Sequence, residues 1–496
     1  MRYNYTQFNS PQFRLLSDSQ IEELHMGVLQ ILERTGVAFE CPEAIELLGG
    51  AGADVSNPDR VKIPSYLVEK ALRTAPQMIT LYSRDGEPSI VLNGMTGPHF
   101  GTAPDPRVIR DPYTGKVRTC YVEDIAEFSR LIDALPNIEW TYTASANTTL
   151  PVFADLDISD RVTLLQFVLN SSKPVISEVT NLEALREVID FCSIIAGSEE
   201  NLRRKPFWGG SCEPVTPLVE GKDAMEKSLL CAEKGLPVVV YGMSMAGATT
   251  PATWPAVLAI SAAEVMAQLV VLQLKNPGAP VIFGSISNIM EMRTTIFPFG
   301  APEMSFLVAA LTELVHYYKL PMWGTAGCTD AHNIGAQMGA EVTYQVMMTY
   351  LSGADLVHDV GILSEAPVTT MSPEVNVFVD EIIDMVKVSM GGIEINEDTL
   401  PLDLIERVGP RGNYVSEKHT LKHFRKFWAP TIFDRSVSKA EDARNCEEML
   451  REKTIRLMET HQPKPLPGDI VKELRKLEVG WLKRIGLKEY PKRPKA

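Results

Sequence analysis

The sequence predicts a (β/α)8 barrel with an N-terminal extension of helices and strands and with additional C-terminal helices. Two observations lead to this fold class. First, five short apolar segments share one design, in which proline opens the segment and glycine or serine closes it. They begin at Pro174, Pro206, Pro237, Pro280 and Pro321. Second, helical stretches separate them, and short apolar strands that alternate with helices are typical of a parallel sheet buried on both faces.

Three further strands complete the expected barrel. Segments at 138–143 and 354–359 extend the repeat on either side. The segment 98–102, followed by a hairpin turn at 111–116, supplies the eighth strand. Eight such units fit the roughly 250 residues of a closed barrel better than an open doubly wound sheet. No Gly-x-Gly-x-x-Gly follows a strand and no P-loop is present, so nucleotide binding has no support in the sequence.

The chain is expected to have three parts: residues 1–95 form the N-terminal extension, 96–400 the catalytic barrel, and 401–496 a C-terminal loop and helices. An amphipathic helix is expected at 469–485. Its apolar positions are Ile470, Leu474, Leu477 and Trp481. Such a stripe needs a surface to cover it, so this helix should dock on the barrel or on another subunit.

Composition excludes several classes of protein. The 496 residues include 63 acidic and 48 basic side chains, a net charge of −15, which argues against nucleic acid or an anionic membrane as a partner. The most apolar run, 255–274, contains Glu264 and Gln268 and ends in a turn, so it predicts a buried helix. The N-terminus lacks an apolar signal region, and seven scattered cysteines argue against a disulfide framework. We therefore expect a cytoplasmic enzyme.

Aromatic residues recur at the carboxyl ends of the expected strands, which is where barrel enzymes carry their active sites. They are Phe100, Tyr142, Trp208, Tyr241, Phe283 and Trp323. A mouth lined by rings with few charges suits a quaternary ammonium ligand, since each ring contributes up to ~2 kcal/mol of cation–π attraction when desolvated. Inward rings that only fill the barrel core are the alternative interpretation.

The segment 324–333 differs from the other strand exits because it is long and built of small residues. It ends in Asp330 and His332, and its glycines and alanines allow the backbone to approach a bulky ligand. His358 follows the neighbouring strand and reaches the same mouth. Two histidines at one rim favour a functional site. Zinc-binding spacings are absent, so no metal site is predicted.

Four segments together resemble the trimethylamine methyltransferase superfamily: GCTDAHNIGAQ (327–337), PHFG (98–101), FPFGAPE (297–303) and GADLVH (353–358). The resemblance covers nearly the whole chain. It implies a (β/α)8 barrel that moves a methyl group from an amine to the Co(I) of a separate corrinoid protein, with no tightly bound cofactor of its own. Trimethylamine enzymes use pyrrolysine at the position that His332 matches here, so the chain is similar to the non-pyrrolysine branch, which includes glycine betaine methyltransferases.

The resemblance implies the following reaction. Co(I) attacks an N-methyl carbon of glycine betaine in line, and dimethylglycine leaves as a neutral tertiary amine, so the protein only orients and desolvates the substrate. His332, His358 and Asp330 are the expected catalytic residues, and the six aromatic residues form the expected cage. Asn147, with the two histidines, is expected to hold the substrate carboxylate, and Arg293 to supply a positive charge.

Other readings stay open at this stage. The same reaction could act on proline betaine, carnitine or γ-butyrobetaine. A barrel lyase or isomerase without a corrinoid, and a non-catalytic betaine-binding protein, belong to different classes. The family also leads us to expect a homo-oligomer.

Overall fold

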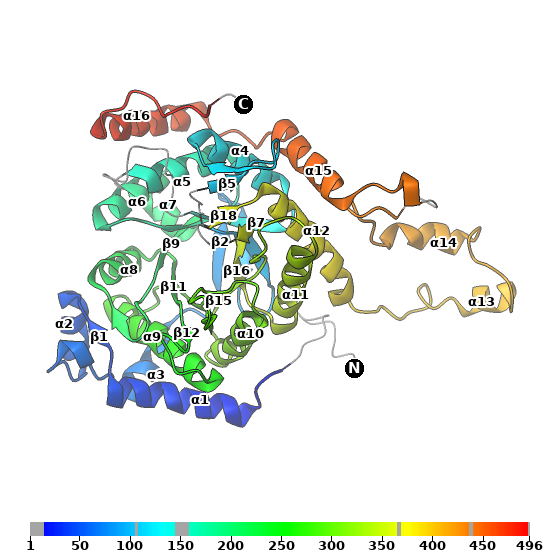
Figure 1. Ribbon diagram of the computed structural model, residues 1–496. Coiled ribbons are helices and arrows are strands. Elements are labelled where there is room, and N and C mark those ends of the chain that lie inside the picture. Colours follow the sequence, from blue (N-terminus) through cyan, green and yellow to red (C-terminus); the bar gives the residue numbers. More distant parts are fainter. Residues whose placement is uncertain (1–13, 105–107, 144–157, 365–368, 436–439, 495–496) are drawn as a thin grey trace.

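The computed structural model describes residues 14–104, 108–143, 158–364, 369–435 and 440–494. Eight parallel strands close into a barrel in the order β11-β13-β15-β16-β4-β7-β8-β9 (Figure 1). In chain order they are β4 (His99–Thr102), β7 (Ile138–Thr143), β8 (Val175–Glu178), β9 (Trp208–Cys212), β11 (Val238–Gly242), β13 (Val281–Ser285), β15 (Met322–Thr325) and β16 (Leu356–Val360). All eight match segments that the sequence predicts, and the fold class is confirmed.

Helices surround the barrel and bury the outer face of its strands (Figure 1). They are α4 (Val122–Ala134), α5 (Ser159–Asn170), α6 (Leu182–Ala196), α7 (Glu199–Arg204), α8 (Lys222–Lys234), α9 (Trp254–Lys275), α10 (Pro302–Tyr317), α11 (Ala336–Ser352) and α12 (Pro373–Met390). All seven cysteines are free. Of these helices, α9 is long and apolar enough to cross a membrane, but its apolar stretch is 89% buried against neighbouring helices and strands. It is the core helix that the sequence predicts.

The N-terminal extension packs on α9 and then closes one end of the barrel. Its elements are α1 (Asp18–Gln30), a π-helical turn η2 (Ile31–Thr35), β1 (Ala38–Phe39), α2 (Pro42–Ala51), a 3-10 turn η3 (Pro58–Arg60), α3 (Ser65–Thr74), β2 (Ile79–Tyr82) and β3 (Pro88–Leu92). A capping box of Ser17 and Gln20 begins α1. The apolar side chains of the β2–β3 hairpin, including Ile90 and Leu92, are buried in one cluster with the barrel interior. Asp355, just before β16, accepts hydrogen bonds from the backbone N–H groups of Asn93 and Gly94 and so fixes the hairpin to the amino ends of the strands.

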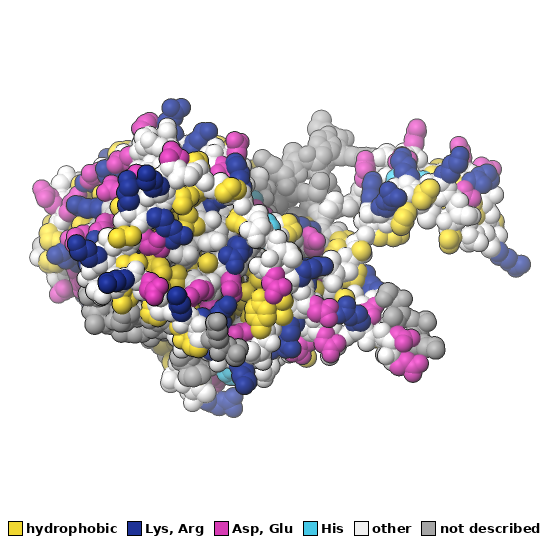
Figure 2. Space-filling model, turned by 90° about the horizontal axis from the view of Figure 1, so that it is seen from above, with side chains coloured by type: hydrophobic (Ala, Val, Ile, Leu, Met, Phe, Trp, Pro, Cys, Tyr) yellow, Lys and Arg dark blue, Asp and Glu magenta, His cyan; other side chains and the backbone are white. Residues whose placement is uncertain are grey.

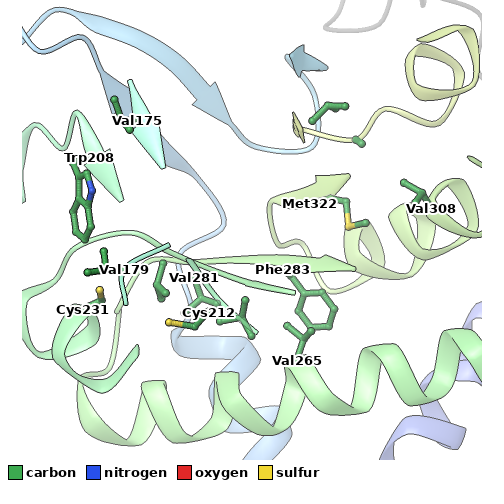
Figure 3. Close-up of a cluster of buried hydrophobic side chains, with 14 of the residues drawn as sticks. Val175, Val179, Trp208, Cys212, Cys231, Val265, Val281, Phe283, Val308 and Met322 are labelled. Carbon is green, nitrogen blue, oxygen red and sulfur yellow. The ribbon is translucent and has the colours of Figure 1, made fainter. Parts of the chain in front are cut away.

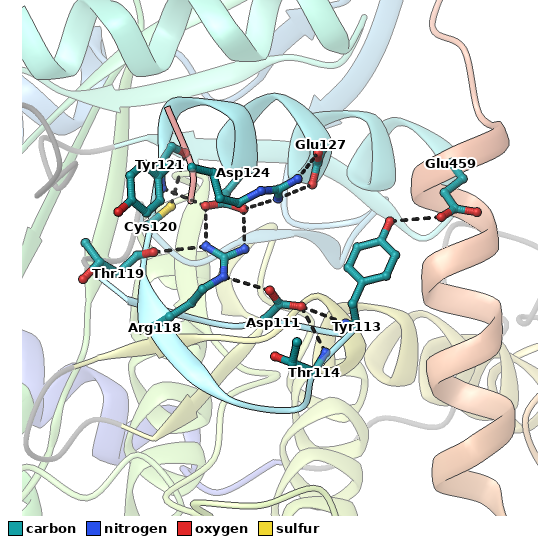
Figure 4. Close-up of polar contacts among 11 residues, drawn as sticks. Asp111, Tyr113, Thr114, Arg118, Thr119, Cys120, Tyr121, Asp124, Glu127 and Glu459 are labelled. Carbon is teal, nitrogen blue, oxygen red and sulfur yellow. Dashed lines mark hydrogen bonds and ion pairs between the residues drawn. The ribbon is translucent and has the colours of Figure 1, made fainter. Parts of the chain in front are cut away.

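Small sheets follow the strands at the opposite, carboxyl end. One contains β17 (Ile362–Ser364), β18 (Thr370–Met371), β5 (Val108–Arg110) and β6 (Val117–Thr119); another pairs β12 (Met245–Ala246) with β14 (Asn288–Ile289). Arg118 anchors the β5–β6 hairpin, because its guanidinium binds Asp124 with two hydrogen bonds of 2.7 Å and Asp111 with one of 2.8 Å (Figure 4). Arg493 from the C-terminal end binds Asp124 as well. This network fixes the rim of the barrel to α4.

The C-terminal part contains α13 (Leu402–Val408), α14 (Lys418–His423), two 3-10 turns (η5, Phe424–Lys426; η6, Ala440–Asp442), α15 (Cys446–Thr460) and α16 (Gly468–Arg484). Helix α15 packs on α4 and α12, and α16 packs on α5 and α6. The Leu474 and Trp481 side chains of α16 are buried, and the Trp481 ring lies 6.1 Å from that of Phe191. The last helix therefore docks on the barrel of its own chain, which is the first of the two expected surfaces.

One buried carboxyl leads to a test of stability. Strand β10 (Val219–Glu220) pairs with β1, and within the described residues neither side-chain oxygen of Glu220 has a hydrogen-bond partner. Burial, and then the nearby Glu264, raise the pKa of Glu220 well above its usual value. A raised folded-state pKa contributes stability that is full below the unfolded pKa and is lost as the pH rises through the folded pKa. We expect E220Q to raise the Tm at about pH 8 and the gain to shrink toward about pH 5. Thermal denaturation checks this, and equal Tm shifts at both pH values would contradict it.

Candidate active site at the carboxyl end of the barrel

A cluster of rings fills the barrel interior near the carboxyl ends of its strands. Trp323 of β15 is at its centre, with ring centroids 4.4 Å from His358, 5.0 Å from Trp140, 5.5 Å from Tyr142 and 5.7 Å from Tyr241. We call these five residues the ring cluster. They come from β15, β16, β7 and β11. Side chains alternate between the two faces of a strand, and these five lie on the face that points into the barrel.

Glycines on the neighbouring strands make room for the two tryptophans. A Cβ atom on Gly284 of β13 would lie 2.7 Å from the Cβ of Trp323, and one on Gly101 of β4 would collide with the Trp140 indole. Rings of this size are unusual in barrel interiors, which mostly contain branched aliphatic side chains. The glycines are therefore a local condition for the ring cluster.

Four oxygen-bearing side chains form a chain of hydrogen bonds beside the rings. The Tyr142 hydroxyl lies 3.0 Å from Ser211 Oγ and 3.0 Å from the Tyr241 hydroxyl. Tyr241 in turn shares a hydrogen bond with the Glu213 carboxyl, which follows β9. An ionised Glu213 accepts a hydrogen bond from the Tyr241 hydroxyl. The Tyr241 oxygen can then accept one from the Tyr142 hydroxyl, so the carboxylate sets the direction of the whole chain. The chain joins the middle of the ring cluster to a carboxyl at the mouth.

Among the described residues, three carboxyls lie beside the ring cluster: Glu178 at the end of β8, Glu213 just after β9, and Asp359 of β16. We call them the mouth carboxyls. Burial raises the pKa of all three, to about 7 for Glu213 and Asp359, and the charges of Glu178 and Asp359 further raise the pKa of Glu213. Among the residues that the structure describes, the positive charge of Lys227 lowers the pKa of Glu178 and of Glu213. Among the described residues, the mouth therefore carries more acidic than basic side chains.

His358 and Asp359 form a buried pair. The His358 Nδ1–H group donates to the carbonyl of Gly324 at 2.9 Å, so Nε2 is left as the acceptor and lies 3.3 Å from Asp359 Oδ2. Burial lowers the pKa of His358 to about 3, so a proton held by this pair lies on the carboxyl. Asp359 has a φ of 76°, a left-handed conformation that is rare for a residue with a side chain.

Asp330 has a positioning role in this structure. Its two oxygens accept hydrogen bonds from the backbone N–H groups of Phe299 (2.9 Å) and Gly300 (2.8 Å). Glu341 of α11 accepts from the backbone N–H of Asp330. These contacts join the segments 297–303 and 327–337, two of the motifs singled out in the sequence. Both oxygens of Asp330 are thus engaged in holding a loop, and the catalytic role expected from the sequence stays a prediction.

Three of the expected cage residues lie on the other side of the strands. Phe100, Trp208 and Phe283 belong to the core between barrel and helices. The Phe100 ring lies 5.8 Å from Tyr350 of α11, and the Phe283 ring 6.2 Å from Tyr318. Figure 3 shows Trp208 and Phe283 among aliphatic side chains of this layer. The expectation that they line the mouth is corrected: they lie out of phase with the inward residues of their strands, and the period-two alternation turns them outward.

The remaining expected residues are dispersed. The Arg293 side chain is 89% exposed and is paired with Glu291, on the loop after β14. His332 is exposed, and its charge lowers the pKa of Asp330, whereas burial raises that pKa more strongly. Asn147 lies outside the described residues. Of the predicted site residues, the structure brings Tyr142, Tyr241, Trp323 and His358 together.

The expected site omits four residues that adjoin this cluster: Glu178, Ser211, Glu213 and Asp359. Ser211 and Glu178 lie at or next to the last position of their strands, a signal that the sequence contains. Within the described part of the chain, rings and three carboxyls with Lys227 as their basic neighbour make an apolar, electronegative site, which suits a cation. The described residues contain no group of three His, Cys, Asp or Glu side chains arranged to hold a metal ion.

Comparison with known proteins identifies the relatives of this chain. Residues 1–478 match the family model described as trimethylamine methyltransferase. A trimethylamine methyltransferase of Desulfitobacterium hafniense (strain DCB-2) is 32% identical over 469 residues, 93% of this chain and 92% of that protein. A glycine betaine methyltransferase of D. hafniense (strain Y51) is 30% identical over 86% of this chain and 88% of that protein. A trimethylamine methyltransferase of Methanosarcina thermophila is 28% identical over 95% of this chain and 98% of that protein. The chain therefore belongs to the trimethylamine methyltransferase family.

Proposed function

We propose that this methyltransferase takes its methyl group from a quaternary amine, with glycine betaine as the first candidate, and passes it to the Co(I) of a separate corrinoid protein. The tertiary amine, dimethylglycine for glycine betaine, is the other product. The chain itself is proposed to hold no tightly bound cofactor. The observation that carries the proposal is the ring cluster bordered by the three mouth carboxyls, with Lys227 as their basic neighbour among the described residues.

The chemistry of the donor explains why such a site suffices. A quaternary ammonium has no N–H group, so ring faces and carboxylates attract it without a hydrogen bond. Its nitrogen leaves as a neutral amine when a methyl carbon is attacked from the side opposite the C–N bond. The protein's residues therefore bind the cation, exclude water and aim one methyl group outward. The neutral product loses the attraction to the rings and carboxylates, which favours its release.

A protonated tertiary amine is the second candidate. The relative at 32% identity is a trimethylamine methyltransferase. Such a substrate also carries a positive charge, and its N–H group needs an acceptor. The mouth carboxyls, when ionised, offer such an acceptor. Proline betaine, carnitine and γ-butyrobetaine remain further candidates of the quaternary class.

One assay tests the proposal. Purified protein is mixed with a Co(I) corrinoid protein and a panel of amines, and the cobalt spectrum is followed. We expect methyl-Co(III) with glycine betaine or another quaternary amine. The matched control is 3,3-dimethylbutyrate, which has the shape of glycine betaine without its positive charge and should not compete with it. Methylation from trimethylamine alone would favour the second candidate, and no methyl-Co(III) with any amine would refute both.

A further inference from the structure

The segment 297–303 brings two more aromatic rings to the carboxyl end of the barrel. It follows β14 and contains Phe297 and Phe299, which we call the phenylalanine wall. Both side chains are buried, and they belong to the same buried cluster as Tyr142 and Trp323. Their rings lie 5.2 Å apart at an interplanar angle of 60°. The phenylalanine wall therefore adjoins the ring cluster, although it lies on a loop and not on a barrel strand.

Three side chains from different elements hold the backbone of the phenylalanine wall. Asn288 of β14 donates a hydrogen bond to the Pro298 carbonyl at 2.6 Å. The Phe299 N–H group donates to Asp330 at 2.9 Å, and the Phe299 carbonyl accepts from Gln345 Nε2 at 2.8 Å. The segment forms no helix or strand until α10 begins, so these hydrogen bonds decide where its rings lie. Buried hydrogen bonds hold a backbone firmly because the surrounding dielectric is low.

Gln345 of α11 joins the phenylalanine wall to the strand that carries Trp323. Its side chain is buried, and its Oε1 atom accepts hydrogen bonds from the N–H groups of Gly327 at 2.9 Å and Cys328 at 3.1 Å. These two residues follow β15, the strand of Trp323. The same amide donates to the Phe299 carbonyl from its other end. Gln345 thus sets the position of the wall relative to the ring cluster.

We propose that the phenylalanine wall selects the substrate by the size of its N-alkyl groups, and that Gln345 is the residue that positions the wall. Such selection rests on the proposed function, in which an ammonium ion binds at the ring cluster. The strands of the ring cluster are held at a fixed spacing by the ladder hydrogen bonds of the barrel. The position of the wall therefore decides how much volume is left around the nitrogen. One extra methylene in an apolar site changes discrimination by roughly 10- to 200-fold.

Two symmetrical ammonium ions test the phenylalanine wall without a corrinoid protein. Tetramethylammonium and tetraethylammonium have the same charge, and each substituent of the second is longer by one methylene. We expect wild-type protein to bind tetramethylammonium at least ~100-fold more tightly than tetraethylammonium. F299L should reduce this ratio at least ~10-fold, because the smaller side chain leaves space for the longer substituents. Isothermal titration calorimetry gives both dissociation constants.

The ratio of the two dissociation constants is the readout because a purely structural change does not alter it. Lys and Arg side chains lie among Asp and Glu over the face of the molecule shown in Figure 2. An ammonium ion held loosely at such a surface responds mainly to charge, and salt screens it there. The two probes carry the same charge, so surface binding gives a ratio near one. Partial unfolding lowers the binding of both probes alike.

Gln345 is tested with a matched glutamine elsewhere in the chain. Gln273 is also buried, and it holds the loop before β13 by accepting from the Gly278 N–H at 2.9 Å and donating to the Ala279 carbonyl at 2.8 Å. This loop lies at the amino ends of the strands. Q345M should reduce the ratio at least ~10-fold, whereas Q273M should lower the Tm and keep the wild-type ratio. F283L, a buried phenylalanine that faces the helices, is the corresponding control for F299L.

The possible results separate this role from the proposed function. Wild-type protein that binds neither probe would refute the proposed function and, with it, the role of the wall. A wild-type ratio near one, or a wild-type ratio retained in F299L, would overturn the wall alone and leave the proposed function standing. A ratio that falls in F299L but not in Q345M would remove Gln345 as the positioning residue. If Q345M does not fold, F299L and its control F283L still decide whether the wall selects by size.

Discussion

Replacing Trp323 by leucine is expected to raise the KM for the ammonium substrate by roughly 30- to 100-fold. The ring lies within 6 Å of four other rings and is the common face of the ring cluster. Loss of one desolvated cation–π contact is worth about 2 kcal/mol, and the cavity left behind loosens the rings around it. Steady-state kinetics with the amine varied and the corrinoid protein saturating measure the effect.

The protein contains a matched control for this substitution. Trp208 is also completely buried and also lies on a barrel strand, but it faces the helices and donates a hydrogen bond from Nε1 to Ser177 Oγ. W208L should lower the Tm, as W323L does, because both create a cavity of several kcal/mol in cost. Its KM should remain within about threefold of wild type. Equal KM values for the two variants would show that the ring cluster does not bind the substrate.

The second large effect is expected at the mouth carboxyls. E213Q keeps the shape of the side chain but removes its charge, and we expect kcat/KM for a quaternary amine to fall about 10- to 100-fold, as for a charge a few ångströms from a cation in a partly screened site. The pKa of about 7 for Glu213 and Asp359 gives this effect a pH signature. As the pH falls through about 7, these groups gain protons and lose their charge, so wild-type kcat/KM should decline.

A quaternary amine does not titrate in this range, so the decline reports the protein. The decline of kcat/KM below about pH 7 should be weaker in E213Q and absent in the double variant E213Q/D359N. The control is E264Q: Glu264 also has its pKa raised to about 7 by burial, but it accepts hydrogen bonds from Thr216 and Leu218 outside the ring cluster. E264Q should show the same decline of kcat/KM below about pH 7 as wild type. An unchanged decline of kcat/KM in E213Q/D359N would show that the mouth carboxyls do not contribute to substrate binding.

The sequence predicts the barrel well because its strands are marked at both ends. Proline is suited to the first residue of a strand, where no ladder hydrogen bond is lost, and glycine or serine follows each apolar run. The strands begin at Val175, Trp208, Val238, Val281 and Met322, within two residues of those prolines. The segment 391–430 could not be predicted in this way, since its helices α13 and α14 have only seven and six residues, and helices that short have little intrinsic stability.

The site is predicted only in part, and the errors share one cause. Tyr142, Tyr241, Trp323 and His358 are correctly placed near one another, whereas Phe100, Trp208 and Phe283 face outward. A strand buried on both faces is apolar throughout, so its sequence does not reveal which alternate residues point inward. Only the glycines opposite the tryptophans contain that information, and they become readable once the register of the neighbouring strands is known.

The β2–β3 hairpin closes the barrel at the amino ends of its strands, because its buried side chains fill the end opposite the mouth. For the proposed reaction, the amine and the corrinoid protein must then use one entrance. The amine has to enter first, since the bulky methyl acceptor covers the way in, and the demethylated amine stays inside until the acceptor withdraws. For the proposed reaction, the closed end therefore predicts an ordered mechanism, in which the amine binds before the corrinoid protein and its demethylated product leaves after it.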